Sequence, residues 1–560
     1  MYSSKPNVNT LTALLVQHGV GHAVVCPGSR NAPIAHNLNE CPDIVCHPVT
    51  DERSAGFYAL GMAQALAQPV AVCVTSGTAL LNLVPAIAEA FYQHQPLVVI
   101  SADRPQQWID QLDGQTLPQP DALGRFVRKA VSLPEYQDEE SHWFCNRLLN
   151  EVLIEMLEDG GGPVHINVPI SEPLFAFCTP TLPQERIFRR YSPSTDYDCL
   201  PQAMVDEWLK AERPMIVFGQ TNPHDFAGHV ADYLFSHVIV LHESLAPFPS
   251  VSHFDEVLGS MQESPEEKEA LRPDVVLYVG DCIVSKRLRK FLREDRNTRV
   301  WRVSPSARVE DTFQNLRGIV KGDAESVLAS LSHKMKFKAN AKAKEFRRQW
   351  LHRLKQAASH ADSLQPPYSQ MAAVKLFEEQ LSTHFAAADP LPFSVHYANS
   401  SAIRLANIYA RHHVWCNRGV NGIEGSLSTA AGFSVAVQPD EKVFCVIGDL
   451  SFFYDQNALW NQNLRGNLRI LLLNNGKGGI FNLLPGLEQS PARDRLVAAQ
   501  HDTTAEGICQ QNNIYYQQAT DMESLQQGLD LLLKANLSRP MLLEVLTNAQ
   551  EDEKAYRANT

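Results

Sequence analysis

Residues 442–485 read KVFCVIGDLSFFYDQNALWNQNLRGNLRILLLNNGKGGIFNLLP and predict the fold class of the chain. An apolar, β-branched run at 443–447 predicts a buried strand that ends at Gly448 and Asp449. A segment of helix length follows, and a second apolar run at 468–473 predicts another buried strand. A strand, a helix and a strand in this order form the repeating unit of a parallel α/β sheet.

Both predicted strands deliver polar residues to the same edge of the sheet, because parallel strands end side by side there. The first strand is followed by Asp449, and the second by Asn474, Asn475 and Gly476. Open α/β sheets bind ligands at this edge, and a glycine lets the backbone approach a ligand closely. Carboxylate and amide oxygens suit Mg²⁺ that is shared with phosphate groups. Each motif alone is also an ordinary turn, but the two together at this separation favour a metal site.

The composition is that of a globular protein. A length of 560 residues predicts about three domains. The formal net charge of −13 argues against a general nucleic-acid surface. Residues 1–10 show no signal-peptide pattern and no apolar run reaches membrane-spanning length, so we expect a cytoplasmic protein without a membrane partner. The cysteines are scattered without a CxxC pair, which favours reduced thiols over disulfides or a zinc site.

Three regions of alternating strand and helix patterns predict an α/β protein with three doubly wound parallel-sheet domains, at 1–180, 200–335 and 365–560. The predicted strands lie at 23–26, 70–74, 97–101, 162–169, 215–218, 238–241, 275–279, 300–303, 393–397, 413–416, 443–447, 468–473 and 542–546. The segments that begin at Cys73 and Cys445 share a layout of strand, glycine turn, helix and strand. This similarity predicts equivalent folds in the first and third domains, which could face each other across a ligand.

Local signals predict several helix ends. A helix is expected at 51–67, which opens with two acids that favour a first turn. Ser369 is expected to cap a helix over 370–381. Residues 179–201 are rich in proline, serine and charge, which is typical of a linker, and the basic run at 334–353 predicts a solvated helix.

The Gly-Asp pair, the 24 residues between Asp449 and Asn474, and the Asn-Asn pair resemble the thiamine diphosphate motif of the 2-oxo acid decarboxylase and carboligase superfamily. Within that superfamily, seven ordered segments are similar to the family of 2-succinyl-5-enolpyruvyl-6-hydroxy-3-cyclohexene-1-carboxylate synthases of menaquinone synthesis. These segments are CPGSRNAP, TDERSAGFYALGMA, TSGTALLNLVPA, SADRP, SKRL, NSSAIRL and NRGVNGIEGSLSTAAG. The resemblance covers almost the whole chain and implies a pyrimidine-binding, a central and a diphosphate-binding domain, in that order.

The resemblance implies thiamine diphosphate and Mg²⁺ as cofactors, with Mn²⁺ as an alternative ion. Asp449, the side chain of Asn475 and the backbone carbonyl of Lys477 resemble the metal ligands of the family. Leu450 stands where many superfamily members have glycine, which we interpret as a mark of the closer family. Gly476 and Lys477 also depart from the usual Asn or Asp followed by Gly, but a backbone ligand tolerates a change of side chain.

Glu52 resembles the glutamate that hydrogen-bonds the aminopyrimidine ring and favours loss of a proton from the thiazolium carbon. Outside its ERSAGFYALGMA context it would be an ordinary first-turn glutamate, and Asp51 beside it is expected to serve the helix start. Ile423 resembles the bulky apolar residue that holds the cofactor in a bent form. The other cofactor contacts that the resemblance implies are Thr75, Ser400, Leu450, Ser451 and Asn475, of which Ser451 is expected to cap a helix at the diphosphate.

Cations are expected around the substrates, because 2-oxoglutarate and isochorismate each carry two carboxylates. The residues that the resemblance assigns to the substrate pocket are Ser29, Arg30, Arg104, Gln115, Lys286, Arg287, Arg404 and Arg418. Arg404 and Arg418 are our first assignment for 2-oxoglutarate. Arg30, Arg104 and the Lys286–Arg287 pair suit isochorismate, although the helix VSKRLRKFLRE reads as a solvated face without the resemblance.

The resemblance implies decarboxylation of 2-oxoglutarate and 1,4-addition of the resulting succinyl carbanion equivalent to isochorismate. The products are 2-succinyl-5-enolpyruvyl-6-hydroxy-3-cyclohexene-1-carboxylate and CO₂. Glu52 and Asp449 belong to different predicted domains and must meet over one cofactor, which the family achieves between subunits. We therefore expect at least a homodimer, with a homotetramer left open.

Three alternatives remain beside this interpretation. A sister enzyme such as acetohydroxyacid synthase or oxalyl-CoA decarboxylase is the nearest, and a yellow purified protein would favour its FAD-bearing members. A nicotinamide oxidoreductase is disfavoured, because the glycine pair Gly19 and Gly21 lacks a third glycine and precedes a strand. Intact Glu52, Asp449 and Asn475 argue against a non-catalytic regulator.

Overall fold

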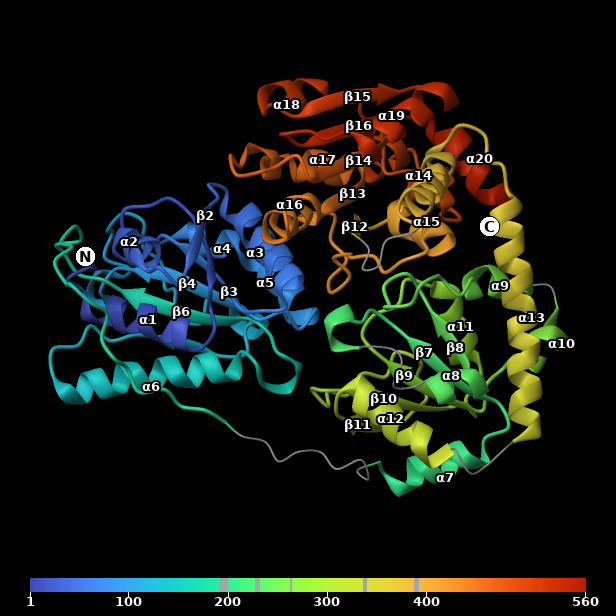
Figure 1. The fold of residues 1–560 in the computed structure, drawn as a ribbon, viewed down its shortest axis with the longest axis horizontal. Coiled ribbons are helices and arrows are strands. Elements are labelled where there is room, and N and C mark those ends of the chain that lie inside the picture. The colour runs from blue at the N-terminus through green and yellow to red at the C-terminus, as the bar shows by residue number, and fades with distance from the viewer. Residues whose placement is uncertain (191–199, 227–231, 262–263, 336–339, 387–391, 560) are drawn as a thin grey trace.

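The chain forms three parallel sheets flanked by helices, as a computed structural model shows (Figure 1). The structure describes residues 1–190, 200–226, 232–261, 264–335, 340–386 and 392–559. The strand orders are β2-β1-β3-β4-β6-β5, β11-β10-β9-β7-β8 and β12-β13-β14-β16-β15. These orders confirm the predicted α/β class with three parallel sheets.

The strands of the first sheet are β1 (His22–Val25), β2 (Val45–Pro48), β3 (Val70–Val74), β4 (Leu97–Asp103), β5 (Ala130–Ser132) and β6 (Val164–Pro169). The second sheet contains β7 (Pro214–Phe218), β8 (Ile239–His242), β9 (Val275–Val279), β10 (Arg299–Ser304) and β11 (Leu316–Lys321). The third sheet contains β12 (Phe393–Tyr397), β13 (Lys442–Gly448), β14 (Leu468–Asn474), β15 (Tyr515–Ala519) and β16 (Met541–Leu546).

The helices around the first sheet are α1 (Pro6–Gln17), α2 (Ala32–Glu40), α3 (Glu52–Leu66), α4 (Thr78–Asn82), α5 (Val84–Tyr92) and α6 (Glu139–Glu155). Those of the central region are α7 (Gln202–Lys210), α8 (Asp232–His237), α9 (Phe254–Ser260), α10 (Pro265–Ala270), α11 (Lys286–Glu294), α12 (Ala324–Met335) and α13 (Ala341–Ser363). The remaining helices are α14 (Gln370–His384), α15 (Ser401–Tyr409), α16 (Ser426–Ala436), α17 (Asp449–Tyr454), α18 (Glu506–Gln511), α19 (Met522–Lys534) and α20 (Ala549–Asn559).

The strands that sequence reasoning missed, β2, β5, β11 and β15, all lie at sheet edges. An edge strand has one unpaired side and is less buried, so its sequence lacks the continuous apolar run of a central strand. The predicted strand at 413–416 is wrong. Trp415 makes only an isolated bridge to His396 of β12, and Val414 instead donates its N–H to the Ser244 carbonyl of the central region at 2.9 Å.

The predicted helix starts agree with the structure. Asp51 caps α3, and Ser369 caps α14 by accepting from the Ala372 N–H at 3.2 Å. Residues 191–199 of the predicted linker and residues 336–339 of the basic run lie outside the described residues. Each predicted domain range contains one sheet, and the domain limits stay predictions. Within the described residues, no helix combines the length and the apolar character that a membrane span requires.

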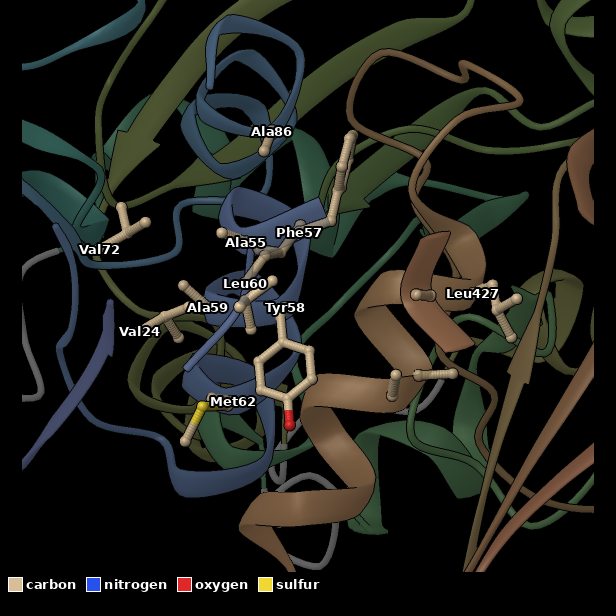
Figure 2. Packing of buried hydrophobic residues seen from close by; sticks show 14 of the residues in the cluster. Val24, Ala55, Phe57, Tyr58, Ala59, Leu60, Met62, Val72, Ala86 and Leu427 are labelled. Carbon is tan, nitrogen blue, oxygen red and sulfur yellow. The ribbon is translucent and has the colours of Figure 1, made fainter. Parts of the chain in front are cut away.

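Helices α3 and α16 join the first and third domains of the chain. Glycines allow their backbones to touch, because a Cβ on Gly61 would lie 1.9 Å from the Thr429 carbonyl oxygen, and one on Gly432 would lie 2.0 Å from that of Tyr58. Tyr58 and Leu427 belong to one buried apolar cluster that spans the two helices (Figure 2). The start of α3, where Glu52 lies, is therefore held against the third domain.

Candidate active site

The carboxyl ends of β13 and β14 lie side by side, so Asp449 and Asn475 meet at one edge of the third sheet. The Asn475 N–H donates to Asp449 Oδ2 at 3.1 Å. The Leu450 N–H donates to Asp449 Oδ1 at 2.7 Å. These two bonds fix the buried carboxylate at the start of α17.

Asn475 presents an amide oxygen that lacks a partner. Its Nδ2 donates to Asp552 Oδ2 at 2.9 Å, whereas its buried Oδ1 accepts no hydrogen bond from any residue in the described ranges. A buried oxygen of this kind is costly in a folded protein, and a bound cation would satisfy it. Together with Asp449 it forms a donor set that suits Mg²⁺. The residues present therefore fit the metal that the motif implies.

The turn after β14 carries the third predicted metal ligand. Gly476 has a φ of +74°, a left-handed conformation that favours glycine, directly before Lys477. The Lys477 ammonium pairs with Asp494 at 3.1 Å. The backbone carbonyl of Lys477 stays the predicted metal ligand. On the other side of the site, His501 Nε2 lies 3.6 Å from Asp449 Oδ2, and this contact raises the pKa of His501.

Ser451 does not cap α17, so this part of its predicted role is wrong. Gly448 is the N-cap, and the Ser451 hydroxyl inside the helix instead donates to the carbonyl of Ile423. This bond ties the loop that carries Ile423 to α17. The Ile423 side chain is 42% exposed, and Ser400 adopts a left-handed φ of 75° before α15. Their contacts with the cofactor stay predictions.

Glu52 is the first residue of α3. Asp51 caps the helix by accepting from the N–H groups of Arg53 at 2.9 Å and Ser54 at 3.3 Å, which confirms its predicted role. Burial and the charge of Glu52 raise the pKa of the Cys26 thiol. Strand β2 ends at Pro48 beside the end of β1 at Val25, and α3 begins at Glu52, so Glu52 lies near the carboxyl edge of the first sheet.

The turns after β1 and β3 gather further predicted residues at this edge. Thr75 packs against Gly28, where a Cβ would lie 2.3 Å from the Thr75 Cβ. Ser29 follows this glycine and is exposed. Gln115 Nε2 donates to the Ser76 carbonyl at 3.4 Å. Thr75, Ser29 and Gln115 therefore lie where α3 begins.

Two guanidinium groups of the first domain already have carboxylate partners. Arg30 is buried, donates to the Ile170 carbonyl at 2.9 Å and pairs with Glu172 at 3.1 Å. Arg104 pairs with Asp113 at 2.8 Å. Both carboxylates are solvent-accessible, so a ligand carboxylate can replace either at modest cost.

A cavity of about 290 Å³ between the central and third domains is lined by three cations and by the carboxylates Glu243, Asp255 and Glu256. Lys286 and Arg287 enter it from the start of α11, and Arg404 enters it from α15. Arg287 pairs with Asp255 at 2.7 Å, whereas Lys286 has no ion-pair partner among the residues that the structure describes. Burial lowers the pKa of Arg404, which donates to the Ser400 carbonyl at 2.7 Å.

A smaller cavity of about 40 Å³ links these cations to the metal edge, because both Arg404 and Asn475 line it. Ile480 and Leu483 contribute apolar walls to both cavities, as does Tyr556 of α20. The third domain therefore places the predicted metal ligand Asn475 and the predicted substrate residue Arg404 at one cavity.

Arg418 is not in the cavity of Arg404, although we assigned both to one substrate. It is buried, donates to Asn399 Oδ1 at 3.1 Å and lines a separate cavity of about 190 Å³.

A cavity of about 420 Å³ at the carboxyl edge of the central sheet is lined by none of the predicted site residues. Glu52 lines none of these four cavities. The predicted residues thus form two groups, one in the first domain and one in the other two.

Sequence reasoning missed His501, Asp552 and Tyr556. The first two touch the metal ligands, and Tyr556 lines both cavities of the third domain. All three lie far along the chain from the Gly-Asp and Asn-Asn pairs, so no local spacing connects them. The single available signal was the pair of Asp552 and Tyr556, which stand one helical turn apart near the end of the chain.

Comparisons with known proteins agree with the sequence motifs. The family model "Thiamine pyrophosphate enzyme, N-terminal TPP binding domain" matches residues 8–123, and the corresponding C-terminal TPP binding domain matches residues 398–545. The chain is 45% identical over 567 residues to the 2-succinyl-5-enolpyruvyl-6-hydroxy-3-cyclohexene-1-carboxylate synthase of Bacteroides fragilis, across 100% of this chain and 99% of that protein. The synthase of Bacteroides thetaiotaomicron is 42% identical across 100% of this chain and 98% of its own length. That of Porphyromonas gingivalis is 34% identical across 100% and 97%.

Proposed function

Because the chain belongs to the 2-succinyl-5-enolpyruvyl-6-hydroxy-3-cyclohexene-1-carboxylate synthase family of thiamine diphosphate enzymes, we propose that it decarboxylates 2-oxoglutarate and adds the succinyl unit to isochorismate. The reaction is a step of menaquinone synthesis. The observation that supports the choice of substrates is that Arg404, which lines the cavity of about 290 Å³ together with Lys286 and Arg287, also lines the small cavity of the predicted metal ligand Asn475.

The cavity supports two dicarboxylate substrates. Lys286, Arg287 and Arg404 supply charge and hydrogen-bond donors, and Ile480 and Leu483 give it an apolar wall. A charged donor that is partly shielded from water binds a carboxylate more strongly than an exposed one. Arg404 is shielded in this way. We assign it to 2-oxoglutarate, because it also lines the cavity of Asn475.

The metal and the cofactor are assigned to the third domain. Asp449, Asn475 and the Lys477 carbonyl would hold Mg²⁺ and, through it, the diphosphate. When bound, thiamine diphosphate supplies a nucleophilic carbon and an electron sink for the loss of CO₂. Glu52 would hold a proton at the aminopyrimidine ring, and Ile423 would support the bent cofactor. Mn²⁺ is an alternative ion.

We propose that the two groups of site residues meet between subunits. Glu52, Arg30 and Arg104 lie in the first domain and line neither cavity of the third. Helix α3 packs against α16 of its own chain, and Arg53 donates to the Tyr454 carbonyl of α17 at 2.9 Å, so the proposed meeting between subunits rests on the family resemblance. At least a homodimer is implied, with a homotetramer left open, and a cytoplasmic location stays a prediction.

A product assay tests this function. Protein, Mg²⁺ and thiamine diphosphate are incubated with 2-oxoglutarate, with and without isochorismate, and the products are identified by mass spectrometry. The carboligated product is expected only when both substrates are present. Equal use of pyruvate in place of 2-oxoglutarate would refute the substrate assignment.

A further inference from the structure

We propose that Asp552, on the C-terminal helix α20, is a positioning residue that turns the amide oxygen of Asn475 toward the metal. This inference rests on the proposed metal site and adds a residue that the sequence motif does not contain. Asp552 Oδ2 accepts from Asn475 Nδ2 at 2.9 Å. The same Asn475 amide leaves its buried Oδ1 without a hydrogen bond from the described part of the chain.

The chemistry of the two side chains makes this orientation specific. An asparagine amide can rotate so that either its oxygen or its NH₂ faces a given neighbour, and only the oxygen binds a cation. An ionised carboxylate only accepts hydrogen bonds, so Asp552 selects the orientation in which Asn475 directs its NH₂ toward α20. Partners of this kind, which orient a metal ligand without touching the metal, typically change metal affinity by about 10- to 100-fold when removed.

Asp552 is itself held firmly. Its Oδ1 accepts from the Gln370 N–H at the start of α14 at 2.8 Å, and its Oδ2 also accepts from Thr547 Oγ1 at 2.7 Å. Helix α20 lies beside α14 (Figure 1). Three donors from three segments therefore converge on one carboxylate. Replacing it with an amide would leave these donors short of acceptors.

The same helix reaches the substrate cavity. Tyr556 lies one turn after Asp552, and both line the small cavity that Arg404 and Asn475 share. The C-terminal helix thus lines the cavity that joins the predicted metal ligand Asn475 to Arg404. An effect of Asp552 on metal affinity is expected from this location.

The first test measures the Mg²⁺ dependence of thiamine diphosphate binding by isothermal titration calorimetry, without substrates. Asp552→Asn is expected to weaken Mg²⁺ about 10- to 100-fold. Glu551→Gln is the matched control: it removes the same charge from the same helical turn, where Glu551 pairs with Lys554 at 2.7 Å on the surface, and it should leave Mg²⁺ binding unchanged. An unchanged Mg²⁺ affinity in Asp552→Asn would overturn the proposal.

A reciprocal variant separates positioning from a structural role. Asn475→Asp alone places a second carboxylate against Asp552 and should weaken binding through repulsion. In the double variant Asn475→Asp/Asp552→Asn, both carboxylate oxygens at position 475 can bind metal, so the orientation of that side chain no longer matters. The amide at position 552 can also donate to the new carboxylate. Mg²⁺ affinity should return to within a few-fold of the wild-type value, whereas additive losses would show that Asp552 acts only through the fold.

Two further measurements make each outcome decisive. If Asp552→Asn does not fold, Thr547→Val removes one bond to the carboxylate and should weaken Mg²⁺ by a few-fold; no change would count against the proposal. Asp449→Ala tests the metal site itself. If Asp449→Ala loses the Mg²⁺ dependence but Asp552→Asn binds Mg²⁺ normally, only the role of Asp552 is refuted. If Asp449→Ala binds Mg²⁺ normally, the proposed metal site itself is refuted.

Discussion

Glu52 stands at the first position of α3, where Asp51 and not Glu52 satisfies the free N–H groups of the helix. Its carboxyl group is therefore not required for the cap and remains available for a ligand.

The variant Glu52→Gln tests the role of this carboxyl group. Glutamine keeps the size of the side chain but cannot exchange a proton, so turnover should fall by about 10²- to 10⁴-fold. Cofactor binding through the diphosphate should be largely unchanged. Steady-state assays and calorimetric titration of thiamine diphosphate measure the two effects. Normal turnover would remove Glu52 from the mechanism.

The variant Asp449→Ala should lose cofactor binding, which Glu52→Gln should retain. Loss of the carboxylate removes a charged metal ligand, so Mg²⁺-dependent retention of the cofactor should disappear. Thiochrome fluorescence after gel filtration measures the retained thiamine diphosphate. Retention equal to that of the wild type would contradict the metal assignment.

At the scale of helices, the contact of α3 with α16 depends on glycines. Gly61→Ala would place a Cβ 1.9 Å from the Thr429 carbonyl oxygen, so the helices must separate. We expect the free energy of unfolding to fall by about 1–3 kcal/mol, as in other overpacked cores. Gly507→Ala, where a Cβ meets nothing within 4 Å on exposed α18, should be neutral or stabilising. Urea unfolding compares the two, and equal stability of both variants would contradict the close contact.

A buried acid–base pair connects α14 to the segment after α15 and predicts a pH dependence. Glu378 accepts from Tyr397 Oη at 2.6 Å and contacts His412 Nε2 at 3.0 Å. Burial lowers the pKa of His412, but the charge of Glu378 and the hydrogen bond to it outweigh burial, so the pKa is raised overall.

A raised folded-state pKa means that folding favours the protonated histidine. The stabilisation is fully present below the ordinary histidine pKa of about 6.5 and is lost as the pH rises through the higher folded-state value. The free energy of unfolding of the wild type should therefore decline above neutral pH more steeply than that of His412→Gln. Denaturant titrations between about pH 6 and 9 test this, and parallel pH curves would exclude the pair as the cause.

At the scale of the molecule, the proposed homodimer would combine two chains in each site. A mixture of the inactive variants Glu52→Gln and Asp449→Ala should then regain activity, because each mixed dimer contains one site with both native residues. Random exchange of subunits in an equal mixture predicts about a quarter of the wild-type activity for a dimer. Activity after mixing and refolding is measured against each variant alone. No recovery in a mixture shown to contain mixed dimers would place the site within one chain.

The amino-acid pattern was sufficient for the fold class and for the meeting of Asp449 and Asn475 at one sheet edge. Central strands such as β9 and β14 are buried on both faces, so they must be continuous apolar runs that can be read directly. Asp449 and Asn475 follow neighbouring strands, so local spacing alone predicts their meeting. The same is true of Asp51 and Ser369, because a helix cap involves residues that are close in sequence.

Tertiary contacts decided what local spacing does not encode. The edge strands β2, β5, β11 and β15 are held by a neighbour on one side only, so their sequences show no continuous apolar run. Arg404 and Arg418 appear equivalent in the sequence, but packing places them in different cavities. Asp552 reaches Asn475 because α20 follows β16, which ends beside β14, and packs beside α14. Such contacts join residues that are distant in the chain, and only the packed structure brings them together.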